Sequence, residues 1–338
     1  MRLRNVTCAV FMSALTIGST MAADWEYGPD LNIPRSDFGA AVDGMGNIYV
    51  AGGQISWCPY ESTDTVEMLL FDGTAYADHW VFLAPISSSR QDVRLVCDGA
   101  FIYAIGGILD DGETVATVER YDTTSDSPVW ETIKPLNVAR GAAGVTVDNC
   151  GRIYVLGGCV NETHEILSSV ELYHPAHPEL GWALLDAGLD QPRMNAGAVT
   201  DNQGRIYATG GQGEYGAHLT SVERYDPRDS EPSWIYVAPI IDPSSNNDHA
   251  AVGADGRIYV AGGWLPGYSS RAVRYDPLTD DWEALPALNA PRSNPELVLG
   301  EDRHIYVIGG DTSGCPDALA SVEHFASWPP RRQYHAPW

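Results

Sequence analysis

A short segment that ends in a double glycine recurs six times along this chain and constrains its fold more than any other feature. The clearest copy is Ile-Tyr-Val-Leu-Gly-Gly at residues 153–158, and each copy carries a tyrosine three residues before its first glycine. The other doublets are Gly52-Gly53, Gly106-Gly107, Gly210-Gly211, Gly262-Gly263 and Gly309-Gly310. A period of about fifty residues is typical of a repeat array, whose units bury their apolar faces against their neighbours. We therefore expect one closed domain.

The repeat that starts at Arg140 shows how one unit is built. Residues 141–147 are small and apolar, and a turn-forming stretch at 148–151 separates them from a second strand at 152–156. A third strand is expected at 169–173 and a fourth around Trp182. Four short strands joined by turns are typical of a propeller blade, and no segment shows helical periodicity. The chain is therefore predicted to be all-β, with four antiparallel strands per blade.

Three further signatures recur in register with the doublets. In five units an arginine lies sixteen or seventeen residues before the doublet, and a tryptophan lies ten or eleven residues before that arginine. Tyrosine–aspartate pairs follow at Tyr121-Asp122, Tyr225-Asp226 and Tyr275-Asp276. Together these residues resemble the kelch repeat, and the resemblance covers residues 23–326. It implies a single kelch-type β-propeller of six blades.

The two ends of the array predict how the ring closes. In the last unit Trp328 follows Phe325 by only three residues, which is too short for the hairpin that elsewhere joins the third and fourth strands. Trp25 has the spacing of a fourth strand but belongs to no complete unit. We therefore expect the N-terminal strand to pair into the last blade, which removes an open sheet edge. Residues 327–338 would then be a C-terminal tail.

Residues 1–22 are predicted to be a secretory signal peptide, because a basic start precedes an apolar run and small residues near Ala22. A retained membrane anchor is the alternative, but the apolar run from Val6 to Ile17 is shorter than the ~20 residues that a span needs. The formal charge of -25 disfavours nucleic acid and anionic membranes as partners. We expect a secreted protein, extracellular or periplasmic, without membrane insertion.

Five cysteines follow the predicted cleavage site, and none has the Cys-x-x-Cys spacing of a zinc site, so neither a metal nor a cofactor is predicted. In an exported protein disulfides are expected. In a closed ring of the kelch type, the loops after the doublets of the first and last blades are neighbours, which predicts a Cys58–Cys315 bridge. Cys97 and Cys150, near the inner hairpin turns of blades 2 and 3, form a second predicted pair, and Cys159 is left free.

Five arginines occupy equivalent positions near the predicted mouth of the central channel, and they allow two interpretations. They are Arg35, Arg90, Arg140, Arg193 and Arg292. One interpretation is an anion-binding ring. The other is a structural ion pair inside each blade, with partners at Glu119, Glu171, Glu223 and Glu323, and at Glu67 in a looser register. Blade 5 favours the second interpretation, because it carries Ser245 and Val273 where both partners should be.

The loops of blades 4 and 5 carry the predicted ligand site. Aromatic faces beside amides, carboxylates and histidines suit a sugar or a peptide, although ordinary loop residues are the simpler interpretation. The blade 5 residues are Asn247, Asp248, His249, Trp264 and Tyr268, and the blade 4 residues are Gln212, Glu214, Tyr215 and His218.

Two functions from different classes are consistent with these residues. The first is a secreted binding protein that holds a protein or glycan ligand on its variable loop face. The second is suggested by the resemblance, since exported kelch-like propellers include sugar-active enzymes such as a sialic acid mutarotase. That chemistry needs an acid–base pair, for which Glu214 with His218 or Asp248 with His249 are candidates. No catalytic motif is present, so the catalytic residues are unknown and we favour the binding protein.

Overall fold

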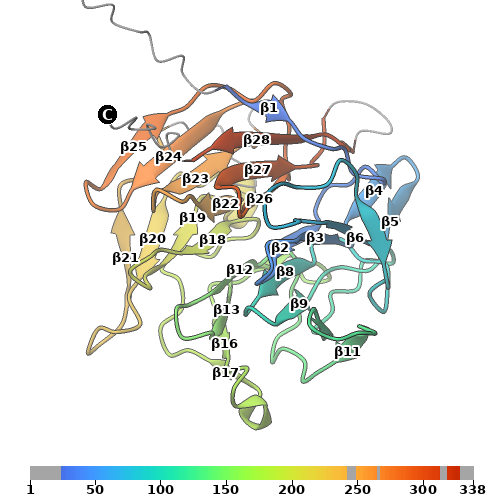
Figure 1. Ribbon diagram of the computed structural model, residues 1–338. Coiled ribbons are helices and arrows are strands. Elements are labelled where there is room, and N and C mark those ends of the chain that lie inside the picture. Colours follow the sequence, from blue (N-terminus) through green and yellow to red (C-terminus); the bar gives the residue numbers. More distant parts are fainter. Residues whose placement is uncertain (1–23, 242–248, 265–266, 313–317, 328–338) are drawn as a thin grey trace, which may run out of the picture.

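The computed structural model describes residues 24–241, 249–264, 267–312 and 318–327, and it contains six four-stranded antiparallel sheets around one axis (Figure 1). Blade 1 comprises β2 (Gly39–Val42), β3 (Ile48–Ala51), β6 (Val66–Leu69) and β7 (Val81–Leu83). Blade 2 comprises β8 (Arg94–Cys97), β9 (Phe101–Ile105), β10 (Val118–Asp122) and β11 (Trp130–Thr132). Blade 3 comprises β12 (Gly144–Val147), β13 (Ile153–Leu156), β16 (Val170–Tyr173) and β17 (Trp182–Leu184).

The second half of the chain repeats this arrangement. Blade 4 comprises β18 (Gly197–Thr200), β19 (Ile206–Thr209), β20 (Val222–Tyr225) and β21 (Trp234–Val237). Blade 5 comprises β22 (Ala250–Val252), β23 (Ile258–Ala261), β24 (Ala272–Asp276) and β25 (Asp281–Ala284). Blade 6 comprises β26 (Glu296–Leu299), β27 (His304–Ile308), β28 (Val322–Ala326) and β1 (Glu26–Tyr27). The innermost strands β2, β8, β12, β18, β22 and β26 contact one another in a closed ring.

Four further elements lie in the loops between these strands. They are the hairpins β4 (Gln54–Trp57) with β5 (Tyr60–Ser62) and β14 (Cys159–Val160) with β15 (Glu165–Ile166), and the 3-10 turns η1 (Pro178–Leu180) and η2 (Glu214–Gly216). Among the described residues, no helix is long and apolar enough to cross a bilayer. The predicted six-bladed, all-β propeller is confirmed.

The N-terminal strand closes the ring as predicted. Strand β1 pairs antiparallel with β28, and Tyr27 lies opposite Glu323. The Trp25 ring packs against Phe325 with 5.1 Å between ring centroids, and its Nε1 donates to the Pro286 carbonyl oxygen at 2.8 Å. Residues from the two ends of the propeller therefore share one sheet, and β1 covers the edge that β28 would otherwise expose.

The tryptophan of each outer strand also joins its blade to the connection that leaves the preceding blade. Each indole N–H donates to a backbone carbonyl there, at 2.8 to 3.2 Å. In addition to the Trp25 bond, the indole donors and their carbonyl acceptors are Trp80 to Pro29, Trp130 to Ala84, Trp182 to Lys134, Trp234 to Ala187, and Trp282 to Ala238. These bonds satisfy a buried polar group while the ring supplies apolar contact area.

The double glycines allow the next blade to approach closely. The Gly158 N–H donates to the Arg193 carbonyl oxygen at 2.9 Å, with φ of 95° at Gly158. A Cβ atom at Gly157 would lie 2.3 Å from that same oxygen, so no side chain fits. The same bond links Gly53 to Arg90, Gly107 to Arg140, Gly263 to Arg292 and Gly310 to Arg35.

Each of the five arginines forms an ion pair with the glutamate of its own blade. The nitrogen–oxygen distances are 2.6 Å for Arg35–Glu67, 2.8 Å for Arg90–Glu119, 2.9 Å for Arg140–Glu171, 2.6 Å for Arg193–Glu223 and 2.7 Å for Arg292–Glu323. Burial lowers the pKa of Arg193, and the facing Glu223 raises it. The five guanidinium groups have no exposed side-chain surface, so they do not form an anion site in the channel.

A second polar repeat lies at the opposite end of the inner strands. The tyrosine of each Ile-Tyr-Val or similar strand donates its hydroxyl to an aspartate in the turn before it, at 2.7 to 3.3 Å. The pairs are Tyr49–Asp43, Tyr103–Asp98, Tyr154–Asp148, Tyr207–Asp201, Tyr259–Asp255 and Tyr306–Asp302. The recurrent spacing predicted the tyrosines but not these aspartate partners.

The predicted Cys97–Cys150 disulfide is wrong, because both thiols are free. Cys97 is half-buried at the end of β8, where its sulfur accepts a hydrogen bond from the Gly99 N–H at 3.3 Å. Cys150 is exposed in the turn before β13. Similar positions in neighbouring blades thus do not give the close approach that a disulfide needs. The Cys58–Cys315 prediction falls partly outside the described residues, since Cys315 is not among them.

Replacing Trp25 by alanine is expected to destabilise the propeller by about 3–5 kcal/mol, because the ring is buried at the seam and no neighbour refills its space. Urea unfolding followed by tryptophan fluorescence measures this change. Tyr27→Ala is the matched control, since Tyr27 is exposed on the same strand. Equal effects of the two substitutions would contradict the role of Trp25 in closing the ring.

Breaking one buried ion pair is expected to cost about 3–5 kcal/mol, because it leaves an uncompensated charge. We expect Arg140→Ser and Glu171→Val to be strongly non-additive, since the double variant copies what blade 5 carries naturally. A double-mutant cycle from urea unfolding measures the coupling. The control cycle uses the more exposed pair Arg120–Glu131, whose coupling should stay below about 1 kcal/mol. Similar coupling in both cycles would show that burial is not the cause.

Candidate functional site

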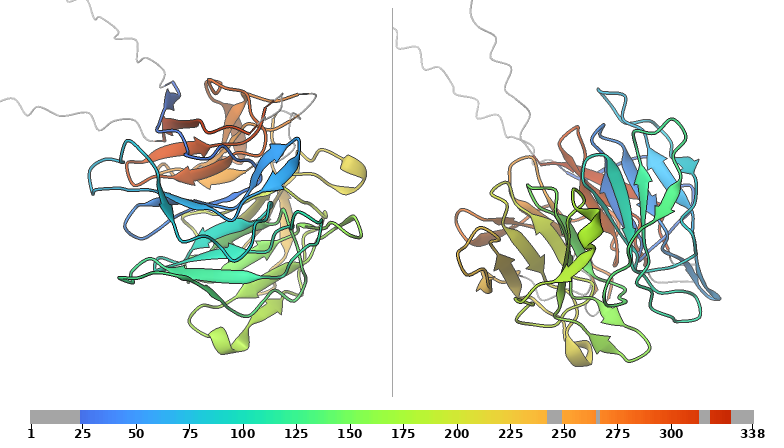
Figure 2. Two further views of the ribbon diagram at one scale, coloured as in Figure 1. Left: turned by 90° about the vertical axis from the view of Figure 1, so that its right-hand side faces the viewer. Right: turned by 90° about the horizontal axis from the view of Figure 1, so that it is seen from below.

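One face of the ring carries both the loop that leads into each inner strand and the loop that follows each doublet. Backbone bridges join the two loops, as in Gln91 with Ile108, Gly141 with Cys159, and Met194 with Gln212. The hairpins β4–β5 and β14–β15 and the turn η2 are all insertions after a doublet, and they project from this face (Figure 2). We call it the loop face.

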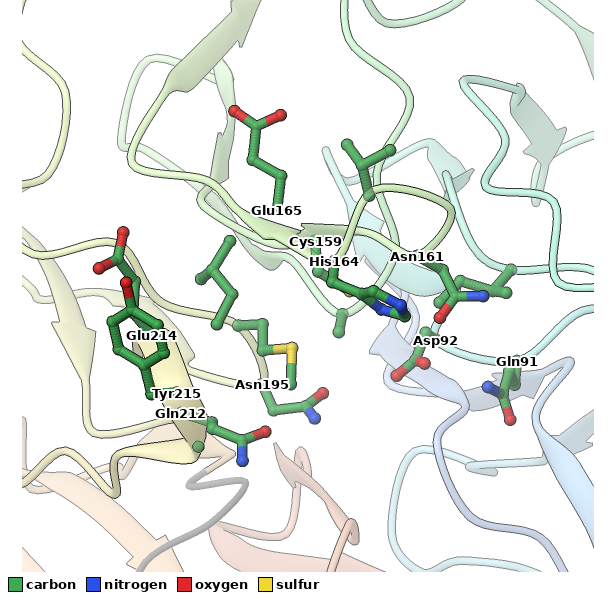
Figure 3. A pocket seen from close by; sticks show the side chains of 16 residues that line it. Gln91, Asp92, Cys159, Asn161, His164, Glu165, Asn195, Gln212, Glu214 and Tyr215 are labelled. Atoms are coloured by element: carbon green, nitrogen blue, oxygen red, sulfur yellow. The ribbon is translucent and has the colours of Figure 1, made fainter.

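The loop face holds a cavity of about 720 Å3 that is bounded by blades 2, 3 and 4 (Figure 3). Polar side chains from all three blades line it: Gln91 and Asp92 from blade 2, Asn161, His164 and Glu165 from blade 3, and Asn195, Gln212, Glu214 and Tyr215 from blade 4. A volume of roughly 300–1,000 Å3 is typical of a ligand pocket. This cavity is the candidate functional site.

A ring of left-handed residues forms the floor. The residue two positions after each of the five arginines has a φ of 50° to 53°, and these residues are Asp37, Asp92, Ala142, Asn195 and Asn294. Backbone hydrogen bonds run from blade to blade along this ring, from Asp92 N to Asp37 O at 2.6 Å, from Ala142 N to Asp92 O at 3.1 Å, and from Asn195 N to Ala142 O at 2.7 Å. Aspartate and asparagine tolerate this conformation better than most residues, which explains their recurrence.

Asp92 is the floor residue whose carboxylate lacks a partner. Its side chain is 8% exposed, and its Oδ1 is buried without a hydrogen bond. Burial and the nearby Asp37 carboxylate raise the pKa of Asp92 to about 7, while Arg94 acts in the opposite direction. Asp37 differs, because its Oδ2 accepts a hydrogen bond from the Ser36 hydroxyl at 2.9 Å. Next to Asp92, the Gln91 Oε1 is likewise buried and unpaired.

Arg94 is the cation that acts on Asp92, and each of its three nitrogens donates to another group. Its Nε donates to the Ala143 carbonyl oxygen at 3.0 Å, and its terminal nitrogens reach the Phe38 carbonyl oxygen at 3.1 Å and the Asn195 side-chain oxygen at 3.2 Å. Arg94 also lies 3.5 Å from Glu296 inside the channel. The guanidinium therefore holds the inner strands together and leaves Asp92 unpaired.

The blade 3 wall is anchored to blade 2. The Glu162 carboxylate accepts hydrogen bonds from the Thr114 N–H at 2.8 Å and hydroxyl at 2.7 Å, and the Asn161 Nδ2 donates to the Gly112 carbonyl oxygen at 3.0 Å. Cys159 lies half-buried in this wall, where burial raises the pKa of its thiol to about 12, so it is a poor nucleophile. The wall is thus held in place before any ligand arrives.

The structure separates the residues of the predicted blade 4–5 site. Gln212, Glu214 and Tyr215 line the cavity, with blades 2 and 3 rather than blade 5 as their neighbours. Trp264 is 39% exposed and lies beside His218, with 6.0 Å between ring centroids, and it bridges to Tyr268. These three residues do not line the cavity.

His249 lies elsewhere, and placing it on the loop face was wrong. It is buried in the channel, with its Nδ1 3.2 Å from the Glu296 carboxylate, because it immediately precedes an inner strand. Asn247 and Asp248 lie outside the described residues.

The structure places the two members of one predicted acid–base pair in different surroundings. Glu214 lines the cavity, whereas His218 does not line it and lies beside Trp264. The pair Asp248–His249 falls partly outside the described residues, since Asp248 is not among them. Among the described residues, no group of three His, Cys, Asp or Glu side chains is arranged to hold a metal ion.

Comparison with known proteins identifies the repeat. The kelch motif family matches residues 139–177, 192–239 and 246–289. These segments contain the strands of blades 3, 4 and 5 except β17, and the other blades share the same strand order. The chain is a kelch-repeat β-propeller.

Similar kelch proteins are longer than this chain. Kelch repeat and BTB domain-containing protein 1 of cowpox virus (strain Brighton Red) is 28% identical over 214 residues, which are 62% of this chain and 36% of the viral protein. Kelch-like protein 26 of Danio rerio is 27% identical over 275 residues, which are 73% of this chain and 43% of the fish protein. This kelch propeller therefore matches less than half the length of each relative.

A solved structure shows the same fold. The structure of YjhT superposes with a TM-score of 0.71 and covers 87% of this chain and 95% of its own, at 15% sequence identity. At that identity the likeness supports the propeller architecture alone.

Of the nine polar lining residues named above, sequence reasoning predicted only Gln212, Glu214 and Tyr215. The other six are Gln91, Asp92, Asn161, His164, Glu165 and Asn195, and they were not predicted because the missing arginine–glutamate pair favoured blade 5. One signal was present, since Asp92 and Asn195 stand two residues after an arginine, where Asp37 and Asn294 also occur. The hairpin β14–β15 carried no comparable pattern.

Proposed function

We propose that this kelch propeller is a secreted binding protein that holds a segment of a partner protein in the loop-face cavity between blades 2, 3 and 4. The observation that carries this proposal is the cavity itself, whose polar floor and walls come from three blades. Loops differ from blade to blade on a constant scaffold, which is how recognition is usually built onto a repeat fold.

The rim and the interior of the cavity suit a protein segment. Tyr215 is fully exposed on η2 with a φ of 56°, so its ring stands free beside the opening. Tyrosine is enriched among binding hot spots, because it supplies a large, rigid contact area. Amide and carboxylate side chains deeper in the cavity offer hydrogen bonds to a main chain.

A glycan is the other ligand that the sequence suggested, and the same binding screen distinguishes it from a peptide. Trp264, Tyr268 and His218 provide aromatic surface in blades 4 and 5, outside the cavity. If sugars bind there, substitutions at Trp264 should weaken binding while substitutions at Tyr215 should not.

Tyr215→Ala is expected to weaken binding about tenfold, because the ring lies at the rim and its loss removes contact area. The labelled protein is screened against a peptide-display library and a glycan array, and the affinities of hits are then measured. Tyr236→Ala is the matched control, since Tyr236 is exposed on β21 of the same blade and does not line the cavity. Peptide hits that are insensitive to Tyr215→Ala, or glycan hits alone, would overturn the proposal.

The proposal also places the protein outside the cytoplasm, on the strength of residues 1–22. Expression of the full chain in a secreting host should yield a mature protein that starts near Ala23, as read by N-terminal sequencing. An Ala22→Arg variant should remain uncleaved, since the peptidase requires a small residue there. A full-length, cell-retained wild-type chain would contradict export.

A further inference from the structure

Three features of the cavity point to the charge of its occupant. The first is the unpaired Asp92 carboxylate on the floor, which is more than nine-tenths buried. Figure 3 shows this carboxylate facing the cavity from beneath the blade 3 hairpin. A buried carboxylate without a hydrogen bond is costly to the protein, and it is normally found paired.

The second feature is the adjacent Gln91 Oε1, a further buried acceptor without a donor. Two neighbouring acceptors need donors from the occupant, and a guanidinium or ammonium group carries several donors and no acceptor.

The third feature is the charge of the surroundings. Glu165 and Glu214 stand at the rim, and neither lysine nor arginine occurs among the described residues that line the cavity. Arg94, beneath the floor, is committed to Ala143, Phe38 and Asn195. In a chain with a formal charge of -25, the local field attracts a cation.

We propose that the cavity recognises a basic side chain of the bound partner, an arginine or a lysine, and that Asp92 pairs with it. This inference rests on the proposed function and specifies its ligand. The basic group occupies the floor, and the rest of a cavity of about 720 Å3 accommodates the neighbouring residues of the segment.

Equivalent positions in other blades indicate a substitution that tests Asp92 without changing the backbone. Asn195 and Asn294 occupy the position equivalent to Asp92 with nearly the same φ, so Asp92→Asn keeps the shape and backbone that the ring already accepts. Asp37→Asn is the matched control. Asp37 has the same ring position and the same chemistry, but it is hydrogen-bonded to Ser36 and does not line the cavity.

The probes are capped pentapeptides, Gly-Ser-X-Ser-Gly, in which X is arginine, lysine or citrulline. Binding to the full chain is measured by isothermal titration calorimetry at low salt and pH 8. We expect the arginine or lysine peptide to bind at least tenfold more tightly than the citrulline peptide. Asp92→Asn should remove this difference, and Asp37→Asn should keep it within about threefold.

Affinity should also depend on pH in a defined direction. Because the bound cation requires an ionised Asp92, affinity should rise about tenfold from pH 6 to pH 8. The other titratable or charged groups around this region are Asp37, Tyr60, Arg94, Cys159, His164, Glu165 and Glu214. The pH dependence that remains in Asp92→Asn measures these other groups, and Asp37→Asn should move the midpoint to lower pH.

Two results would overturn the inference. One is equal affinity for the arginine, lysine and citrulline peptides, and the other is undiminished binding of a basic peptide by Asp92→Asn. If binding of a partner depends on Tyr215 but not on Asp92, the proposed function stands and this inference fails. If basic peptides require Asp92 while Tyr215→Ala has no effect on any partner, the cation site is supported and the proposed function fails.

Discussion

The arginine that begins five of the six blades is the contact on which the propeller depends. Its side chain is buried against the glutamate of the same blade, and its backbone carbonyl accepts the N–H of the second glycine from the blade before. The glutamate also accepts backbone N–H groups from the connection that leads in, as Glu171 does from Asn137 and Val138. One residue therefore joins the inner strand, the third strand and the neighbouring sheet. A charge buried this deeply persists because a carboxylate and several backbone carbonyl groups compensate it, as at Arg140.

This arrangement explains why the loop face can vary without loss of the fold. The blade-to-blade contacts use backbone atoms, the arginine and the outer tryptophan, so the insertions after the doublets carry little of the scaffold. Blades 3 and 4 use that freedom for the hairpin β14–β15 and the turn η2, which become two walls of the cavity. The left-handed position two residues after the arginine supplies its floor, with Asp92 left unpaired.

The failed predictions share one cause, which is that equivalent positions in a repeat are not equivalent in environment. Cys97 and Cys150 occupy similar turns, yet one sulfur is half-buried against Gly99 and the other is exposed. His249 directly precedes an inner strand and therefore lies in the channel beside Glu296. Blade 5 does lack the arginine–glutamate pair, but the cavity opens between other blades. The missing pair in blade 5 is therefore a difference in the scaffold and does not mark the binding site.

The sequence by itself determined the number of blades, the strand order, the partners of the arginines and the closure by Trp25, because these follow from spacing that recurs in every unit. The six units can be compared with one another. A residue type that recurs at the same position predicts a contact that the blades share. Only the tertiary structure decided which loops meet, which carboxylate stays unpaired and where the cavity lies. The physical reason is that loops diverge from blade to blade. Asp92, the β14–β15 hairpin and η2 line one cavity but are distant in sequence and share no pattern.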